Sequence, residues 1–181
     1  MSVPNHSEHL GVVTFKGAPM TLVGPALVIG EAAPEETLTG AGLKPVMPLE
    51  QSAGKARLFI TVPSVDSSTC SLESKRFSDE LKAFPTGAPI AVYVVSADLP
   101  QAQKRWCGAE GVENLTMLSD HRGLVWGSAW GVVLKELHLL ARAVFVVGKD
   151  DNIAYKEIVG EVASEPDYGK AIEALKVAAS V

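Results

Sequence analysis

The amino-acid sequence predicts an α/β fold, in which helices flank a central mixed β-sheet and a β-hairpin extends the N-terminal side. Short apolar runs typical of buried strands alternate with helical patterns through the middle of the chain. Two more strand-like runs then follow one another directly, and an amphipathic segment closes the chain. With 181 residues, 47% hydrophobic and 20% charged, the chain has the size and balance of a single globular domain over residues 1–181.

The N-terminal part is expected to form the hairpin and then a passage rich in loops. Residues 11–24 contain two β-rich runs that turn around Lys16 and Gly17. Residues 30–55 carry Gly and Pro at short intervals, which indicates loops. The run ARLFITVP, residues 56–63, is apolar and short, as in a buried strand, and ends at a proline.

A helix is expected next. Within residues 68–84 the side chains of Phe77, Leu81 and Phe84 share one helical face, with charged residues opposite. Residues 88–98 then resemble a second buried strand.

A short second helix follows, over residues 99–107. Asp98 is its expected cap, Pro100 lies in its first turn, and Gly108 is expected to follow its end. Residues 113–118 are predicted as a third short strand.

The C-terminal part is predicted as a loosely helical segment, a hairpin and a last helix. The hairpin covers residues 141–160, with its turn near Asp150. The helix covers residues 164–179, where Ser164 and Asp167 have the spacing of a capping box. This order of elements is that of the thioredoxin fold.

Charge and composition exclude several classes of protein. A net charge of −5 leaves no broad basic surface, so nucleic acid and anionic membranes are not expected as partners. The N-terminus lacks the features of a secretory signal, and the longest apolar runs are too short to span a bilayer. We therefore expect a soluble, cytoplasmic protein. Its two cysteines are too few for a disulfide scaffold and do not form a C-x-x-C pair.

The first cysteine occupies a position that suits a reactive thiol. Asp66, Ser67 and Ser68 are residue types that cap a helix, which places Cys70 in the first helical turn and near the surface. Free N–H groups and the helix dipole favour an anion there. Because helix N-termini stabilise thiolates, the sequence predicts a nucleophilic sulfur at position 70.

The second cysteine is placed in the opposite way. Cys107 falls in the last turn of its expected helix, just before Gly108, where the dipole disfavours a thiolate. This asymmetry suits a redox cycle in which one thiolate reacts and a second thiol resolves the product. The alternative is that Cys107 is an inert, buried cysteine that packs as a small hydrophobe.

Two other kinds of site receive less support. The cysteines and histidines show no spacing typical of metal ligands, so no metal is expected. A cysteine hydrolase with His121 or His138 as its base is conceivable. His138, within KELHLLAR, has the pattern of a partly buried or surface histidine.

Several motifs resemble those of the peroxiredoxins. The stretch PSVDSSTC matches the signature Pro-x-x-x-Thr/Ser-x-x-Cys of that family through Pro63, Ser67 and Cys70. Residues 96–120 resemble the segment around the resolving cysteine of bacterial thiol peroxidases, which are atypical two-cysteine peroxiredoxins. The C-terminal half, including SEPDY, and the N-terminal hairpin are similar to that family as well. The resemblance covers nearly the whole chain.

This resemblance implies a role for each matching residue. Cys70 corresponds to the peroxidatic cysteine and Cys107 to the resolving cysteine. Ser67 corresponds to the hydroxyl that hydrogen-bonds the thiolate and the peroxide, and Arg142 to the active-site arginine. Pro63 corresponds to the proline that shields the site. Taken singly, Ser67 fits a simple cap, Arg142 a surface charge and Pro63 a strand breaker.

The sequence also departs from the family pattern. Glu36 and Ser52 stand where an aromatic residue is common, which puts the packing of the loop-rich passage in doubt. Serine instead of threonine at position 67 keeps the hydroxyl but loses the methyl group that stiffens χ1. We expect activity to survive this change.

The family implies a thiol-specific peroxidase that reduces hydrogen peroxide and organic hydroperoxides without a cofactor. Cys70 would become a sulfenic acid and then form an intramolecular disulfide with Cys107, which thioredoxin reduces. A disulfide needs Cα atoms within about 7 Å, so two cysteines on separate helices would require local unwinding. The family also suggests a homodimer. The alternatives are a redox sensor or a thiol–disulfide relay on the same fold, or a structural protein with two buried cysteines.

Overall fold

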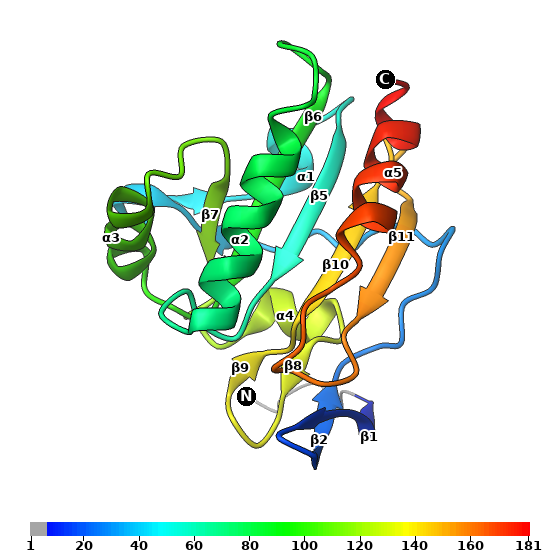
Figure 1. Ribbon diagram of the computed structural model, residues 1–181. Helices are drawn as coiled ribbons and strands as arrows, with labels where there is room; N and C mark the ends of the chain where they lie inside the picture. Colours follow the sequence, from blue (N-terminus) through cyan, green and yellow to red (C-terminus); the bar gives the residue numbers. More distant parts are fainter. Residues whose placement is uncertain (1–6) are drawn as a thin grey trace.

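A computed structural model describes residues 7–181 (Figure 1). Residues 1–6 lie outside the described residues. The expected domain starts within this stretch, and so does the N-terminal segment that lacks the features of a secretory signal. Within residues 7–181, none of the helices has the length and apolar character that crossing a membrane requires.

The central sheet is mixed, as predicted. Its strands lie in the order β11 (Ile153–Ile158), β10 (Ala143–Val147), β5 (Ala56–Thr61), β6 (Ile90–Ser96), β7 (Thr116–Ser119), β3 (Leu38–Thr39) and β4 (Pro45–Val46). Strands β5, β6 and β7 are parallel, while β10 pairs antiparallel with both β5 and β11. The carboxyl ends of the parallel strands therefore lie at one edge of the sheet, where the loop to the next helix begins.

Helices cover both faces of this sheet (Figure 1). They are α1 (Pro48–Gln51), α2 (Ser68–Leu81), α3 (Pro100–Glu110), α4 (Val125–Ala129) and α5 (Tyr168–Ala179), with a short 3₁₀ turn, η1 (Ala41–Leu43). Helices α2 and α3 are the crossovers that join β5 to β6 and β6 to β7. Helix α3 packs beside β7 and η1, and α2 contacts α5.

The two faces have separate hydrophobic cores because side chains alternate along each strand. Leu58 of β5 is fully buried on the face that α2 and α5 cover, together with Phe77 of α2. Its neighbour Phe59 is fully buried on the opposite face, 5.0 Å from the ring of Trp130 between centroids. Trp126 of α4 stacks on Trp130 at 4.6 Å, so α4 closes the second face with aromatic area.

The predicted N-terminal hairpin is present and starts slightly earlier than expected. It consists of β1 (Glu8–Phe15) and β2 (Ala18–Val23), with Lys16 and Gly17 at the turn. Both turn residues have positive φ, as a tight two-residue hairpin requires. The hairpin continues through β8 (Val133–Leu134) and β9 (Leu139–Leu140) into a second, four-stranded sheet.

The predictions for the ends of α3 were wrong. Leu99 is its N-cap residue, and Asp98 instead accepts hydrogen bonds from Ser64 Oγ, the Val65 N–H and Ser96 Oγ. Asp98 therefore joins the loop after β5 to the end of β6. Gly108 lies inside the helix, which ends at Gly111 in the left-handed conformation.

The start of α5 also differs from the prediction. Ser164 precedes the helix, which begins at Tyr168, and Asp167 is itself the N-cap. The carboxylate of Asp167 accepts the backbone N–H of Lys170, so a single cap replaces the expected capping box.

One of the two departures from the family pattern has a structural use. Ser52 is buried, and its Oγ accepts a hydrogen bond from Nε of Arg57 at 2.9 Å. Arg57 is fully buried and donates further bonds to the carbonyls of Leu49 and Gly148. The serine thus satisfies a buried cation that an aromatic side chain would leave without this partner. Glu36 is half-buried.

Candidate active site

Cys70 lies in the first turn of α2, where the sequence predicted it. Ser67 is the N-cap of this helix, with an extended backbone, and its Oγ accepts the N–H of Cys70 at 3.3 Å. The helix begins here because Ser67 satisfies one of the free N–H groups of its first turn. The sulfur therefore lies next to the positive end of the helix dipole.

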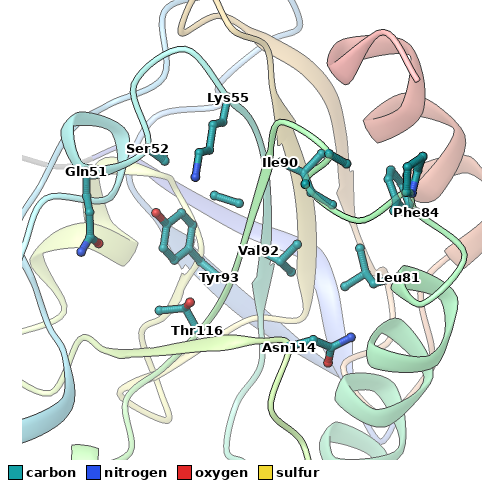
Figure 2. A pocket seen from close by; sticks show the side chains of 14 residues that line it. Gln51, Ser52, Lys55, Leu81, Phe84, Ile90, Val92, Tyr93, Asn114 and Thr116 are labelled. Atoms are coloured by element: carbon teal, nitrogen blue, oxygen red, sulfur yellow. The ribbon is translucent and has the colours of Figure 1, made fainter.

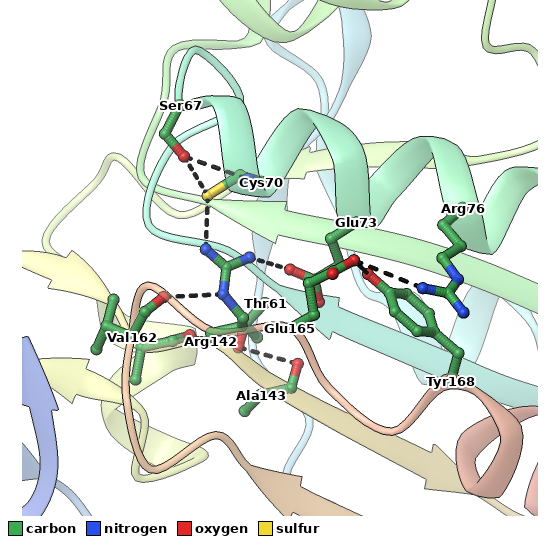
Figure 3. A network of polar contacts seen from close by, with 11 residues as sticks. Thr61, Ser67, Cys70, Glu73, Arg76, Arg142, Ala143, Val162, Glu165 and Tyr168 are labelled. Atoms are coloured by element: carbon green, nitrogen blue, oxygen red, sulfur yellow. Dashed lines mark hydrogen bonds and ion pairs between the residues drawn. The ribbon is translucent and has the colours of Figure 1, made fainter.

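Two donors point at the sulfur of Cys70 (Figure 3). The hydroxyl of Ser67 donates to Sγ at 2.6 Å, and Nη2 of Arg142 donates to it at 3.3 Å. A hydroxyl donor and a cation are both groups that interact favourably with negative charge on sulfur. The expectation that Cys70 lies near the surface was wrong, because its side chain is fully buried against the core beneath α2.

Arg142 is buried, with 1% of its surface exposed, so it is not a surface charge. It immediately precedes β10, and the hydroxyl of Thr61 donates to the carbonyls of Ala141, at 2.7 Å, and Ala143, at 3.3 Å. Its Nε donates to the carbonyl of Val162 at 2.9 Å. These contacts fix both the backbone and the plane of the guanidinium, so that one edge faces Cys70.

The other edge of the guanidinium contacts Glu73, which sequence reasoning missed. Nη1 of Arg142 donates to Oε2 of Glu73, whose side chain is fully buried. Burial opposes the charge of Arg142, but the Glu73 carboxylate and the Cys70 sulfur outweigh it and raise the pKa of the guanidinium. One signal was available in the sequence, because Glu73 lies three residues after Cys70 and such residues are neighbours on a helix.

Glu73 has an unusual environment for a carboxyl group. Burial raises its pKa to about 8, because desolvation outweighs the attraction of Arg142. Its second oxygen, Oε1, has no hydrogen-bond partner among residues 7–181. Burial therefore favours the neutral form of this carboxyl, while the contact with Arg142 favours its charged form.

A second set of polar residues closes the site on the side of α5 (Figure 3). The hydroxyl of Tyr168 donates to Glu165 at 2.7 Å, and the Arg76 guanidinium lies 4.3 Å from the centre of the Tyr168 ring. The ring of Tyr168 also packs against Phe77. This group joins α2 to the start of α5, and the charge of Glu165 adds to the rise in the pKa of Glu73.

Pro63 begins the loop that leads from β5 to Ser67, and it is half-buried. The strand ends two residues earlier, at Thr61, so Pro63 starts the irregular chain that carries the cap.

Cys107 forms no disulfide with Cys70. It lies on α3, half-buried, and both cysteines are free. Burial raises the pKa of its thiol, so the neutral form is favoured, as predicted. The prediction rested on the helix dipole, whereas burial is the cause in the structure. Cys107 lines a largely apolar cavity of about 500 Å³, to which Lys44 and Lys104 also contribute.

Two further hollows have linings that do not include Cys70. One of about 530 Å³ opens near the amino ends of β5 and β6, where Lys55 and Tyr93 extend toward the same space (Figure 2). A smaller one of about 260 Å³ is lined by His121 and His138. His121 pairs through Nδ1 with Ser119 Oγ at 2.8 Å rather than with a cysteine, which does not support the hydrolase alternative.

The residues described by the structure hold no group of three or more His, Cys, Asp or Glu side chains arranged to bind a metal ion. The polar groups around Cys70 are a hydroxyl, a guanidinium and a protonatable carboxyl. Such a set suits a thiolate and the redistribution of charge during an attack by sulfur.

Comparisons with known proteins agree with this chemistry. Residues 29–172 match the model of the Redoxin family. The chain is 47% identical to a thiol peroxidase of Halalkalibacterium halodurans over 166 residues, which are 92% of this chain and 98% of that protein. It is 42% identical to the thiol peroxidase of Bacillus subtilis over 164 residues, 91% of this chain and 96% of the relative.

Solved structures show the same fold. A peroxiredoxin-like protein from Aquifex aeolicus superposes with a TM-score of 0.83 at 35% identity, covering 93% of this chain and 98% of the other. A thiol peroxidase from Chromobacterium violaceum superposes with a TM-score of 0.81 at 19% identity, covering 91% and 95% of the two chains. These findings confirm the thioredoxin-like fold and the family that the motifs predicted. The chain belongs to the Redoxin family, among its thiol peroxidases, and its function is the thiol-dependent reduction of peroxides.

Proposed function

We propose that Cys70 is the peroxidatic cysteine. Its thiolate attacks the terminal oxygen of a hydroperoxide, the O–O bond breaks, and the departing oxygen takes a proton to leave as water or an alcohol. The sulfur is oxidised to a sulfenic acid. One observation carries this assignment: the Cys70 sulfur accepts hydrogen bonds from Ser67 Oγ and from Nη2 of Arg142 in the first turn of α2.

Three further residues take part in the proposed step. Arg142 stabilises the thiolate and then the charge that moves onto the departing oxygen. The hydroxyl of Ser67 holds the peroxide in line with the sulfur. Pro63, at the start of the same loop, shields the sulfur from water. The fixed orientation of the guanidinium, between Glu73 and the Val162 carbonyl, supports the role of Arg142.

Cys107 is the proposed resolving cysteine. Its thiol condenses with the Cys70 sulfenic acid, an S–S bond forms, and water leaves. The two sulfurs lie on different helices and are free in this structure, so the disulfide requires a local rearrangement of α2, α3 or both. The protonated state of Cys107 is consistent with this order, because the thiol waits until a sulfenic acid is present.

Thioredoxin is the proposed reductant of this disulfide, and hydrogen peroxide and organic hydroperoxides are the proposed substrates. A homodimer in the cytoplasm, where thioredoxin keeps thiols reduced, is the proposed setting. The relatives named as thiol peroxidases support the cycle as a whole.

Peroxide consumption coupled to thioredoxin, thioredoxin reductase and NADPH tests the assignment. Cys70→Ser is expected to abolish turnover. Cys107→Ser, the matched control, is expected to consume one equivalent of peroxide per chain and then stop. Turnover that survives Cys70→Ser would refute the role of Cys70. Sustained turnover of Cys107→Ser would show that the intramolecular disulfide is not required. Stoichiometric but slow oxidation of the wild-type protein would favour a redox sensor.

A further inference from the structure

The orientation of the Arg142 guanidinium depends on a backbone carbonyl that residues outside the active site hold in place. Its Nε donates to the carbonyl of Val162, which lies in the segment 159–163 that follows β11. A second bond joins the two segments, because the N–H of Val159 donates to the carbonyl of Arg142. The direction of the guanidinium therefore depends on where this segment lies.

The N-terminal hairpin holds that segment in place. The N–H of Thr14 donates to the Gly160 carbonyl at 2.7 Å, and the N–H of Val162 donates to the Thr14 carbonyl at 2.8 Å. Thr14 and Glu161 thus form a parallel bridge between parts of the chain that are far apart in sequence. The same Val162 whose carbonyl fixes Arg142 is bound through its N–H to the hairpin.

The carboxylate of Glu161 joins this contact to the hairpin turn. Oε2 accepts the Thr14 hydroxyl at 2.8 Å and the Gly17 N–H at 3.1 Å, and Oε1 accepts the N–H groups of Lys16, at 3.0 Å, and Ala163, at 3.1 Å. These bonds, led by that of Thr14, lower the pKa of Glu161 to about 2. The carboxylate is therefore charged throughout the working range of pH.

The turn that Glu161 binds is costly to form without support. Lys16 adopts a φ of 51° and Gly17 a φ of 80°. A residue with a Cβ rarely adopts a positive φ, and Lys has no side-chain group suited to stabilising it locally. The charged oxygens of Glu161 stabilise this turn because both N–H groups converge on them.

We propose that Glu161 is a positioning residue of the peroxidase. It locks the β1–β2 turn onto the segment 159–163, which holds the Val162 carbonyl against Arg142 and thereby directs the guanidinium at the Cys70 sulfur. The β1–β2 hairpin is then part of the structure that holds the active site in place. The proposal rests on the proposed function, since it assigns Glu161 a role through Arg142.

The test compares Glu161→Gln with Asp150→Asn in a Cys107→Ser background. Asp150 is a suitable control because it also accepts hydrogen bonds in a hairpin turn, from Asn152, and its pKa is also lowered by them. Asp150 lies in the turn between β10 and β11, at the opposite end of β10 from Arg142. The readouts are the ultraviolet absorbance of the Cys70 thiolate at neutral pH, the second-order rate constant of oxidation by peroxide, and the melting temperature.

Glu161→Gln is expected to lower the thiolate absorbance and to slow oxidation about tenfold, since misplacing a catalytic group by about 1 Å can cost up to ~100-fold. Asp150→Asn is expected to lower the melting temperature without changing either chemical readout. Normal absorbance and a normal rate in Glu161→Gln would overturn the proposal. The absorbance is measured without peroxide, so it tests whether Glu161 supports Arg142 independently of the reaction. A wild-type protein that failed to react with peroxide would refute the proposed function instead.

A double-mutant cycle with Arg142→Lys separates positioning from a general loss of stability. If Glu161 acts through Arg142, Glu161→Gln costs little further rate once Arg142 is replaced. Equal costs in both backgrounds would overturn the proposal. Thr14→Val removes one hydrogen-bond donor to Glu161 and keeps the shape of the side chain. It is expected to give a smaller change in the same direction, and it replaces Glu161→Gln in the test if that variant does not fold.

Discussion

The indole N–H of Trp106 donates to the hydroxyl of Ser71 at 3.0 Å. Trp106 immediately precedes Cys107 on α3, and Ser71 immediately follows Cys70 on α2. This hydrogen bond therefore joins the two helices at the neighbours of the two cysteines. Trp106 also packs into the core beneath α2, so α3 cannot move toward Cys70 without disturbing this side chain.

Trp106 is expected to report the formation of the disulfide. Oxidation by one equivalent of peroxide should change the intrinsic fluorescence of the wild-type protein, and this change should be lost in Trp106→Phe. Trp126 and Trp130 stack on each other in the core on the other face of the sheet, so they supply a constant background. An unchanged response in Trp106→Phe would contradict a rearrangement at this contact between α2 and α3.

Ser71→Ala tests the hydrogen bond itself. Removing the acceptor destabilises the reduced arrangement, and a typical net contribution of about 1 kcal/mol predicts resolution up to ~5-fold faster. Stopped-flow fluorescence after oxidation measures this rate. A slower resolution would indicate that Ser71 assists the disulfide step instead of restraining it.

Ser67 is expected to have two separable effects. Ser67→Ala removes the helix cap, at a cost of about 1 kcal/mol in the free energy of unfolding. It also removes a donor to the sulfur, which should slow oxidation at least about tenfold. Ser67→Thr keeps the hydroxyl and should stay close to the wild-type rate. Ser68→Ala, on the adjacent residue of α2, is the control, and a comparable loss of rate in that variant would argue against a specific role of Ser67.

Glu73 is expected to make the reaction sensitive to alkaline pH. Its pKa of about 8 means that the carboxyl is mostly neutral below that pH and becomes an anion above it. Two anions, Glu73 and Cys70, then share the cation of Arg142, so the rate of peroxide reduction should decline as pH rises through about 8. Glu73→Gln should remove this decline, whereas Glu80→Gln, on the exposed side of α2, should keep it.

The same shift has a consequence for stability. The pKa of Glu73 in the folded protein lies above its usual value of 4.5, so the folded state binds the proton more tightly than the unfolded state. Stability therefore falls as pH rises from about 4.5 to about 8. Urea unfolding of Glu73→Gln across this range should show a weaker fall than the wild-type protein.

Asp120 should make the stability of the protein depend on pH in a second, lower range. Its carboxylate accepts the N–H groups of Trp126 and Gly127 at the start of α4, yet burial raises its pKa from 3.8 to about 6. The folded state again holds the proton more tightly, so stability falls as pH rises between about 4 and about 6, by up to ~3 kcal/mol. Asp120→Asn should flatten this part of the urea-unfolding profile. A profile unchanged from wild type would show that Asp120 does not titrate in that range.

Local features of the site could be predicted from the sequence because they depend on neighbours in the chain. Ser67 caps α2 and Cys70 lies in its first turn, since capping is decided by residues within one helical turn. The turn at Lys16 and Gly17 was found for the same reason. The ends of α3 were predicted wrongly, because Asp98 finds stronger partners in Ser64 and the Val65 N–H, which are distant in sequence.

By itself, then, the sequence determined the order of the longer helices and strands, the place of Cys70 on α2 and, through its motifs, the family. Only the tertiary structure decided what surrounds the sulfur. The sheet order places β10 beside β5, and this brings Arg142 to Cys70 from 72 residues away. The same packing buries Cys70 and Glu73 and places Glu161 against the hairpin turn. The physical reason is that desolvation and long-range hydrogen bonds depend on which segments pack together, and no local pattern of residues encodes that.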